Sequence, residues 1–195
     1  MIVITNPSPI ADEISIIDSL FEEGLTLLHI RKPNFSQVEL AKFIHQIKHE
    51  YRKNLVLHNH YEIATDFGIN RIHFPETERK KNDFSIENMI LSTSTHSIDD
   101  FNALENIFEY AFLSPVFTSI SKENYIPKTD LFEDLAKREN FSTKLVALGG
   151  IHLDNIEKSL QHGFDDVALL GTIWNSPNSI KNFKLCQKIA LSHLA

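Results

Sequence analysis

The chain has 195 residues, of which 42% are hydrophobic and 23% are charged, and its formal net charge is −7. This length predicts a single domain with a sizeable core, while the negative charge argues against a nucleic-acid or membrane-surface partner, which would need a basic face. No apolar run approaches the roughly 18 residues of a membrane span, and the start lacks the features of a signal peptide. The single cysteine, Cys186, excludes an internal disulfide. We therefore expect a cytoplasmic protein, and a homo-oligomer is possible.

Short β-like runs alternate with helix-like runs along the whole chain. They recur about every 24 residues, the size of a compact βα unit, and the expected strands are residues 2–5, 25–31, 54–58, 71–74, 90–94, 110–114, 144–149 and 167–171. Eight such units predict one α/β domain over residues 1–195, a closed eight-stranded parallel (β/α) TIM barrel. An open sheet of five or six strands is the alternative, but it would leave clear apolar runs without a place.

Local patterns predict where several helices begin. A serine followed by proline suits an N-cap and first helical residue, and a serine or aspartate three residues before a glutamate has capping-box spacing. Residues 76–84 are charged and are expected to form a loop rather than a helix. The expected helix starts are Ser8 with Pro9, Ser36 with Glu39, Asp154 with Glu157, and Ser176 with Pro177.

Two apolar strands, residues 144–149 and 167–171, end abruptly in glycine. Fully apolar strands occur where both faces of a parallel sheet are covered, and glycine lets backbone N–H groups come close to a ligand. In TIM barrels, two such strand ends beside a short helix form a phosphate site. The expected phosphate-binding residues are Gly149, Gly150, Leu170 and Gly171.

Histidines gather at the expected strand ends, where a TIM barrel carries its chemistry. Of the ten histidines, five lie there: His29, His58, His60, His73 and His96. This clustering predicts a polar pocket, although a hydrogen-bonded core role suits His29 and His73 as well as a ligand contact does. The His58–His60 spacing resembles the metal-binding pattern of some barrel hydrolases, but those sites need an acid at the end of the eighth strand. Because Gly171 stands there, we do not expect a hydrolytic metal centre.

The longest connection between expected elements, residues 114–128, has the side chains to bind phosphate or pyrophosphate oxygens. They are Ser119, Ser121 and Lys122. Tyr125 is placed to cover a bound ring, so the loop is also a candidate lid. An ordinary solvated loop with a surface lysine is the alternative.

In this order, the segments resemble the thiamine phosphate synthase and TenI-type thiazole tautomerase family. The likeness covers about residues 2–174, and its motifs are residues 29–31, 57–64, 72–74, 94–97, 114–122, 148–151 and 170–171. The resemblance implies a compact eight-stranded barrel in which Arg31 and Lys122 contact pyrophosphate, Ser94 faces the substrate, and the glycine ends bind a thiazole phosphate.

The family resemblance implies one of two reactions. The synthase joins hydroxymethylpyrimidine pyrophosphate to thiazole phosphate and releases pyrophosphate, while Mg²⁺ and cationic side chains stabilise the leaving group. The tautomerase moves a proton with a histidine. Where synthases have an Asn-Asp pair this chain has His58 and Asn59, so one magnesium carboxylate is missing. Glu76 or Glu78 stands near the second acidic position, and the tautomerase's sixth-strand histidine would fall at Pro115.

We expect a thiamine phosphate synthase-like transferase that acts on phosphorylated thiazole and pyrimidine substrates. A TenI-like tautomerase, with His58 or His96 moving the proton, is the first alternative, and a barrel that binds thiazole phosphate without catalysis is the second. Mg²⁺ is the cofactor that the resemblance implies, with Glu78 as its expected ligand. The expected catalytic residues are Lys122, His58 and Arg31, and the expected substrate-binding residues are His29, Asn59, His73, Ser94, His96, Ser119 and Ser121.

Overall fold

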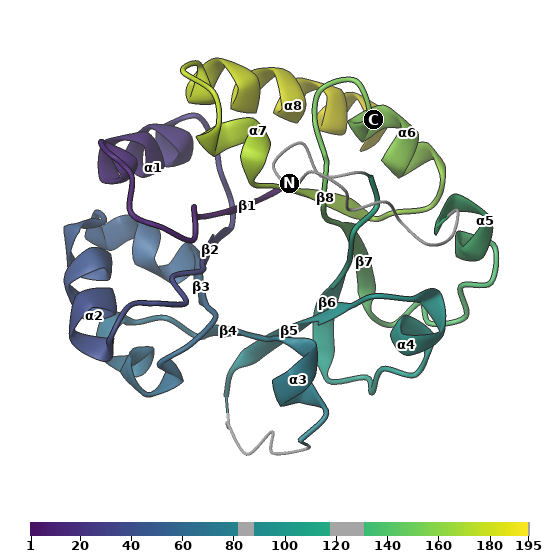
Figure 1. The fold of residues 1–195 in the computed structure, drawn as a ribbon, viewed down its shortest axis with the longest axis horizontal. Coiled ribbons are helices and arrows are strands. Elements are labelled where there is room, and N and C mark those ends of the chain that lie inside the picture. The colour runs from purple at the N-terminus through teal and green to yellow at the C-terminus, as the bar shows by residue number, and fades with distance from the viewer. Residues whose placement is uncertain (82–87, 118–130, 195) are drawn as a thin grey trace.

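In a computed structural model, the chain forms a closed barrel of eight parallel strands with helices packed around it (Figure 1). The structure describes residues 1–81, 88–117 and 131–194. The strands are β1 (Ile2–Ile4), β2 (Leu28–Ile30), β3 (Leu55–Leu57), β4 (Arg71–Phe74), β5 (Ile90–Thr95), β6 (Phe108–Leu113), β7 (Lys144–Ala147) and β8 (Asp166–Leu169). They follow one another around the barrel in chain order, and β8 closes it by pairing in parallel with β1. The predicted TIM barrel is confirmed.

Helices and short helical turns fill the connections between strands. The α-helices are α1 (Glu13–Glu22), α2 (Gln37–Gln46), α3 (Glu76–Arg79), α4 (Ile98–Asn102), α5 (Leu131–Leu135), α6 (Ile156–Gln161), α7 (Gly171–Trp174) and α8 (Ser179–Leu194). Short 3-10 helices cover His49–Asn54, Tyr61–Ile63 and Thr65–Phe67. The longest helix, α8, runs along the upper edge of the barrel in Figure 1. Among the described residues, no helix is long and apolar enough to cross a membrane.

One predicted helix start is confirmed. Ser36 caps α2 through the predicted capping box, because its side chain accepts from the Glu39 N–H and Glu39 reaches back to the Ser36 N–H. The prediction for the first helix is wrong, since α1 begins at Glu13. The reason is visible in the hydrogen bonds: the Asn6 and Ser8 carbonyls accept from the Lys32 ammonium, so this segment stays non-helical.

The other three expectations for helix boundaries are also wrong. α6 begins at Ile156, because the Asn155 side chain holds a turn by accepting from the His152 N–H and donating to the Gly150 carbonyl. α8 begins at Ser179, whose hydroxyl donates to the Ile173 carbonyl. Within the expected loop 76–84, residues Glu76–Arg79 form the short helix α3.

The inside of the barrel is divided into an apolar and a polar part. Its apolar part is a cluster drawn mainly from β1 and β6–β8: Ile2, Ile4, Tyr110, Phe112, Val146 and Ala168. The polar part comes from β2, β4 and β5, where His29, His73 and Ser92 are almost fully buried. A larger apolar core lies between the strands and the surrounding helices and includes Cys186 of α8. The barrel therefore brings polar side chains to the ends of β2–β5 and an apolar floor beneath β7–β8.

Candidate active site

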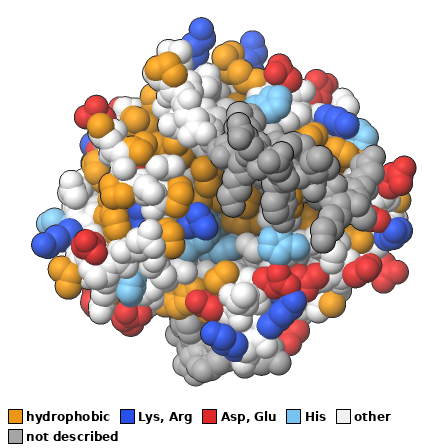
Figure 2. All heavy atoms as spheres, in the orientation of Figure 1, with side chains coloured by type: hydrophobic (Ala, Val, Ile, Leu, Met, Phe, Trp, Pro, Cys, Tyr) orange, Lys and Arg blue, Asp and Glu red, His pale blue; other side chains and the backbone are white. Residues whose placement is uncertain are grey.

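A cavity of about 610 Å³ opens at the carboxyl ends of the strands. Figure 2 shows a hollow near the middle of this end of the barrel, with histidine side chains beside it. Its volume is in the range that encloses small organic ligands. Of the residues predicted for the site, those that line the cavity are Arg31, His58, His73, Ser94, His96, Gly149, Gly150, Leu170 and Gly171.

The predicted phosphate-binding residues meet on the β7–β8 side of the cavity; we call Gly149, Gly150, Leu170 and Gly171 the glycine cradle. Gly149 and Gly150 have φ angles of +97° and +66°, which residues with a Cβ rarely adopt. A Cβ on Gly149 would also lie 3.0 Å from the Cα and Cβ of Pro115. Both backbone conformation and space therefore require glycine at position 149.

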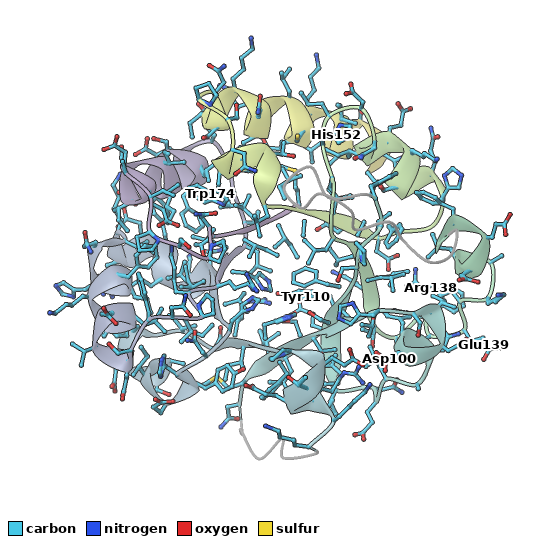
Figure 3. All side chains as sticks on the ribbon, viewed as in Figure 1. Asp100, Tyr110, Arg138, Glu139, His152 and Trp174 are labelled. Carbon is cyan, nitrogen blue, oxygen red and sulfur yellow. The ribbon has the colours of Figure 1, made fainter. Side chains whose placement is uncertain are left out.

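Short contacts hold the two strand ends of the cradle together. The Thr172 hydroxyl donates to the Ile151 carbonyl, which joins the segments that follow β8 and β7. The indole N–H of Trp174 donates to the Ile4 carbonyl at 2.6 Å and fixes α7 against β1 (Figure 3). In α7, which begins at Gly171, the Ile173 and Trp174 N–H groups donate to the Leu170 carbonyl, which leaves the Gly171 and Thr172 N–H groups of the first turn to face an anion. The backbone, rather than side chains, thus determines the chemistry of this side.

Opposite the cradle, His29, His58 and His73 pack together at the ends of β2–β4; we call them the histidine wall. Nδ1 of His29 is hydrogen-bonded to Nε2 of His58 at 2.8 Å, and Nε2 of His29 is hydrogen-bonded to the Tyr110 hydroxyl at 2.6 Å. Figure 3 shows Tyr110 lying within the ring of strands. Both nitrogens of His29 are therefore used inside the barrel, while His58 reaches the cavity.

His73 lies between two serine hydroxyls of the neighbouring strand β5. Its Nδ1 is 3.0 Å from Ser92 Oγ, and its Nε2 is 2.9 Å from Ser94 Oγ. The imidazole ring also stacks on that of His58, with centroids 4.3 Å apart and planes inclined by 25°. Ser94 is thereby held at the cavity surface by a buried imidazole.

Burial keeps the histidine wall uncharged. Loss of hydration lowers the pKa of His29 and of His58 well below the usual value, and the neighbouring His73 lowers both further. The same burial, together with the Arg31 charge, lowers the pKa of His73 to about 3. All three rings are consequently neutral at neutral pH, and each has one N–H donor and one acceptor nitrogen.

The two cations that follow β2 have different environments. Lys32 is completely buried, and its ammonium donates to both carboxylate oxygens of Glu13, the shorter contact being 2.6 Å, and to the Asn6 carbonyl at 2.7 Å. Burial lowers the pKa of Lys32 and raises the pKa of Glu13, and their hydrogen bonds oppose both shifts. Arg31, in contrast, is exposed and lines the cavity. Lys32 is thus a structural cation, and Arg31 is available to a ligand.

Of the sequence motif His58–His60, only His58 lines the cavity. Asn59 donates from Nδ2 to the Lys32 carbonyl at 3.3 Å, and its buried Oδ1 has no hydrogen-bond partner among the described residues. Nε2 of His60 is 2.8 Å from the Phe35 carbonyl oxygen.

His96 lies at the cavity rim. Its Nδ1 is 2.7 Å from the Ser114 carbonyl oxygen, and its Nε2 is 3.6 Å from a Glu76 carboxylate oxygen. The hydrogen bond to Ser114 fixes the ring and leaves only Nε2 for other partners. Three further predicted residues, Ser119, Ser121 and Lys122, lie outside the part of the chain that the structure describes.

The magnesium ligands implied by the resemblance can be tested against the carboxylates at the cavity. Glu78, the expected ligand, accepts a 2.8 Å hydrogen bond from the Tyr61 hydroxyl and does not line the cavity. Glu76 does line it, and a hydrogen bond from Lys80 lowers the pKa of its carboxyl group. A magnesium ion bound through phosphate oxygens needs only one or two carboxylates. Among the described residues, Glu76 has the position and charge for that role.

Sequence reasoning missed Tyr110 and Ser92, which complete the polar interior. Tyr110 belongs to a mainly apolar run and Ser92 to a run of serines and threonines, and the local sequence does not mark either as a partner of histidines on β2 and β4. The signal that could have found them is alternation: residues 92 and 94 of β5, and 110 and 112 of β6, share one face of their strands. In the structure, Ser92 and Tyr110 are direct neighbours across the β5–β6 pairing.

The fold and cavity define a TIM-barrel protein with a small-molecule site at the carboxyl ends of its strands. The sequence profile of the thiamine monophosphate synthase family (TMP-TENI) matches residues 1–173. The chain therefore belongs to this family, and the predicted resemblance is confirmed.

Curated relatives and a solved structure agree with this assignment. The thiamine-phosphate synthase of Staphylococcus carnosus is 24% identical over 173 residues, covering 84% of this chain and 82% of the relative. That of Lawsonia intracellularis is 25% identical over 189 residues, covering 92% and 87%. The crystal structure of thiamine phosphate pyrophosphorylase from Bacteroides thetaiotaomicron is 28% identical, with a TM-score of 0.79 over 97% of this chain and 96% of that one. These names support the prediction of a thiamine phosphate synthase-like transferase.

Proposed function

We propose that this protein couples hydroxymethylpyrimidine pyrophosphate with thiazole phosphate and releases pyrophosphate. The observation that carries the proposal is the layout of the cavity, which has an exposed guanidinium, Arg31, at the end of β2 and a glycine-lined backbone surface after β7 and β8. Two phosphorylated substrates require two anion sites in one enclosure. Family membership supports the same reaction.

Each part of the cavity has a distinct role in this proposal. The glycine cradle holds the thiazole phosphate through backbone N–H groups and the start of α7. Arg31 and Lys122 hold the pyrophosphate, and Ser94 and Ser119 contact substrate. The assignments of Lys122 and Ser119, like that of Ser121 as a further substrate contact, rest on the sequence motif alone, since these residues are outside the described part of the chain.

The chemistry is stabilisation of a leaving group. As pyrophosphate departs from the pyrimidine, negative charge grows on its oxygens, and a fixed cation lowers the energy of that state. The neutral histidine wall adds no competing positive charge beside Arg31, so an anion is drawn to the guanidinium. When bound, Mg²⁺ would neutralise part of the pyrophosphate charge, and Glu76 is the described residue that would hold it.

A coupling assay tests this proposal. The protein is incubated with both substrates and MgCl₂, with and without a chelator, and pyrophosphate and the coupled product are measured together. We expect equal amounts of the two products, and loss of both with the chelator. Arg31→Gln should lower the rate, whereas the exposed Lys53→Gln should not. Binding of both substrates without product would overturn the proposal.

One observation favours a second candidate, a tautomerase acting on thiazole phosphate. His58 lines the cavity as a neutral imidazole and can take or give a proton there. His96 is a weaker candidate, because its Nδ1 is bound to Ser114. Such an isomerase would change the ultraviolet spectrum of the thiazole isomer without metal, and His58→Gln would abolish that change.

A further inference from the structure

Beneath the cavity, the histidine wall is part of a longer chain of hydrogen bonds. One arm runs from His58 through His29 to Tyr110, with contacts of 2.8 and 2.6 Å. A second arm runs from Ser94 through His73 to Ser92, with contacts of 2.9 and 3.0 Å.

The two arms meet inside the barrel. Ser92 and Tyr110 are paired residues of β5 and β6. Burial raises the pKa of the Tyr110 phenol, and a hydrogen bond with the Ser92 hydroxyl, which also lies 3.2 Å from the Ile72 carbonyl oxygen, lowers it by less. The outer ends of the arms, His58 and Ser94, both line the cavity. Because Nε2 of His58 is bound to His29, its Nδ1 is the ring nitrogen left for a ligand.

We propose that these six groups form a proton relay whose two ends, His58 and Ser94, face the same ligand. The relay accepts a proton from the ligand at one end and returns a proton at the other. This inference concerns the cavity of the proposed function and rests on a heteroaromatic ligand being bound there.

The proton count of the relay balances without any charged intermediate. A ligand donor gives its proton to Ser94 Oγ, and the Ser94 hydroxyl proton moves to Nε2 of His73. The Nδ1 proton of His73 passes to Ser92, and the Ser92 proton passes to Tyr110. The Tyr110 proton then moves to Nε2 of His29, the Nδ1 proton of His29 moves to Nε2 of His58, and His58 Nδ1 returns a proton to the ligand. Every group ends neutral, and the ligand ends as its tautomer.

Burial is the reason that such a route suits this site. Charging any of the three imidazoles is costly there, as their lowered pKa values indicate, whereas a concerted shift of protons creates no buried charge. The rings could also be considered as metal ligands, because their nitrogens lie within 4.8 Å of one another. However, a metal ion lies in the plane of each imidazole that binds it, and the stacked rings of His58 and His73 do not share such a point. The observed ring geometry therefore favours proton transfer.

The relay makes a prediction that isolated histidines would not. Protons can move along the relay in either direction. In both cases His29, His58 and His73 carry their proton on the same nitrogen: all on Nδ1, or all on Nε2. Long-range ¹H–¹⁵N correlation spectra of the wild-type protein at pH 7.5 report this directly. We expect three neutral rings with matching tautomers. A protonated ring, or His73 opposite in tautomer to His29 and His58, would overturn the proposal without any variant.

A variant tests the link between the arms. In Tyr110→Phe, the ¹⁵N shifts of His29 and His58 should change and their tautomers should no longer follow that of His73. The matched control is Tyr51→Phe, which removes a phenol from a ring stacked on Phe21 outside the cavity, and it should leave all three histidines unchanged. Unchanged shifts in a folded Tyr110→Phe would contradict the relay.

Coupling assays on the same samples separate this inference from the proposed function. If the wild-type protein couples its substrates but its histidine tautomers do not match, the relay is wrong and the proposed function stands. If the tautomers match but the protein neither binds nor couples the substrates, the proposed function is wrong and the relay stands.

Discussion

The glycine cradle and the histidine wall face each other across one cavity, yet they are built in opposite ways. In the cradle, backbone conformation defines the surface, as the positive φ angles of Gly149 and Gly150 show. In the histidine wall, side chains from separate strands define it, and each depends on a buried partner. A surface of backbone N–H groups suits an anion such as phosphate and depends little on the neighbouring side chains. A side-chain site can change its chemistry with few substitutions, and this is the side where the chain departs from the synthase pattern.

The largest loss of stability is expected from a substitution in the buried Lys32–Glu13 pair, whose lysine follows the β2 strand of the histidine wall. Lys32→Met leaves the Glu13 carboxylate buried without its cation, which should cost about 3–5 kcal/mol of stability. Replacing Glu13 by Leu in the same variant should recover much of that loss. Chemical unfolding measures both changes.

The control for this prediction is a salt bridge of similar length on the surface. Lys48 and Glu22 are 2.7 Å apart but exposed, so Lys48→Met should leave stability nearly unchanged. Equal losses in the two lysine variants would show that burial does not set the strength of the Lys32 pair.

In the cradle, Gly149→Ala should disturb both the fold and the phosphate site. The positive φ angle alone should cost about 1–3 kcal/mol, and the contact with Pro115 should displace the cradle and raise the KM for thiazole phosphate about 100-fold. Gly163→Ala is the matched control, since Gly163 has a φ of +106° but no atom within 4 Å of the added Cβ. It should lose stability without losing substrate affinity. A KM increase in both variants would mean that strain, and not the cradle, explains the effect.

Between the two regions, Arg31→Gln should weaken only the pyrophosphate side. Losing one charge-assisted contact costs about 1.5–3 kcal/mol, which corresponds to about 10- to 100-fold in kcat/KM for the pyrimidine pyrophosphate. The KM for thiazole phosphate should change little. Steady-state kinetics with each substrate varied in turn measures this selectivity, and an equal loss toward both would contradict the division of the cavity.

The last expected effect is a pH dependence of stability that the histidine wall causes. Its histidines have a lower pKa in the folded protein than the usual value of about 6.5, so unfolding takes up protons below that pH. The contribution of these histidines to the free energy of unfolding should be fully present above pH 6.5. It should be lost as the pH falls further, by about 1.4 kcal/mol per pH unit for each histidine. Urea unfolding at pH 7.5, 6.5 and 5.5 measures the slope.

Two variants test whether the slope of unfolding free energy against pH comes from the histidine wall. His58→Gln should make it shallower by one histidine, while replacing the exposed His45 of α2 by Gln should not change it. A slope that His58→Gln leaves intact would place the pH dependence elsewhere in the molecule.

The sequence predicts the barrel well because its signals are local. Each strand is a short apolar run, and alternation with helical runs leaves few other arrangements. Helix starts were harder, since Asn6 and Ser8 are drawn to Lys32, a residue far along the chain. The position of Gly149, Gly150 and Gly171 at the cavity is predictable, because glycine at the end of a strand lets the backbone come close to a ligand. The Tyr110–His29 contact and the burial of Lys32 depend on side chains that only the closed barrel brings together.

The most direct test of the account is a calorimetric titration of the wild-type protein with thiazole phosphate alone. The account predicts saturable binding of one molecule per chain, weakened by inorganic phosphate as a competitor. It also predicts that Gly149→Ala weakens the binding about 100-fold and that Gly163→Ala retains it. Absence of saturable heat in the wild-type protein, or equal binding by Gly149→Ala, would contradict the claim that the glycine cradle holds the thiazole phosphate.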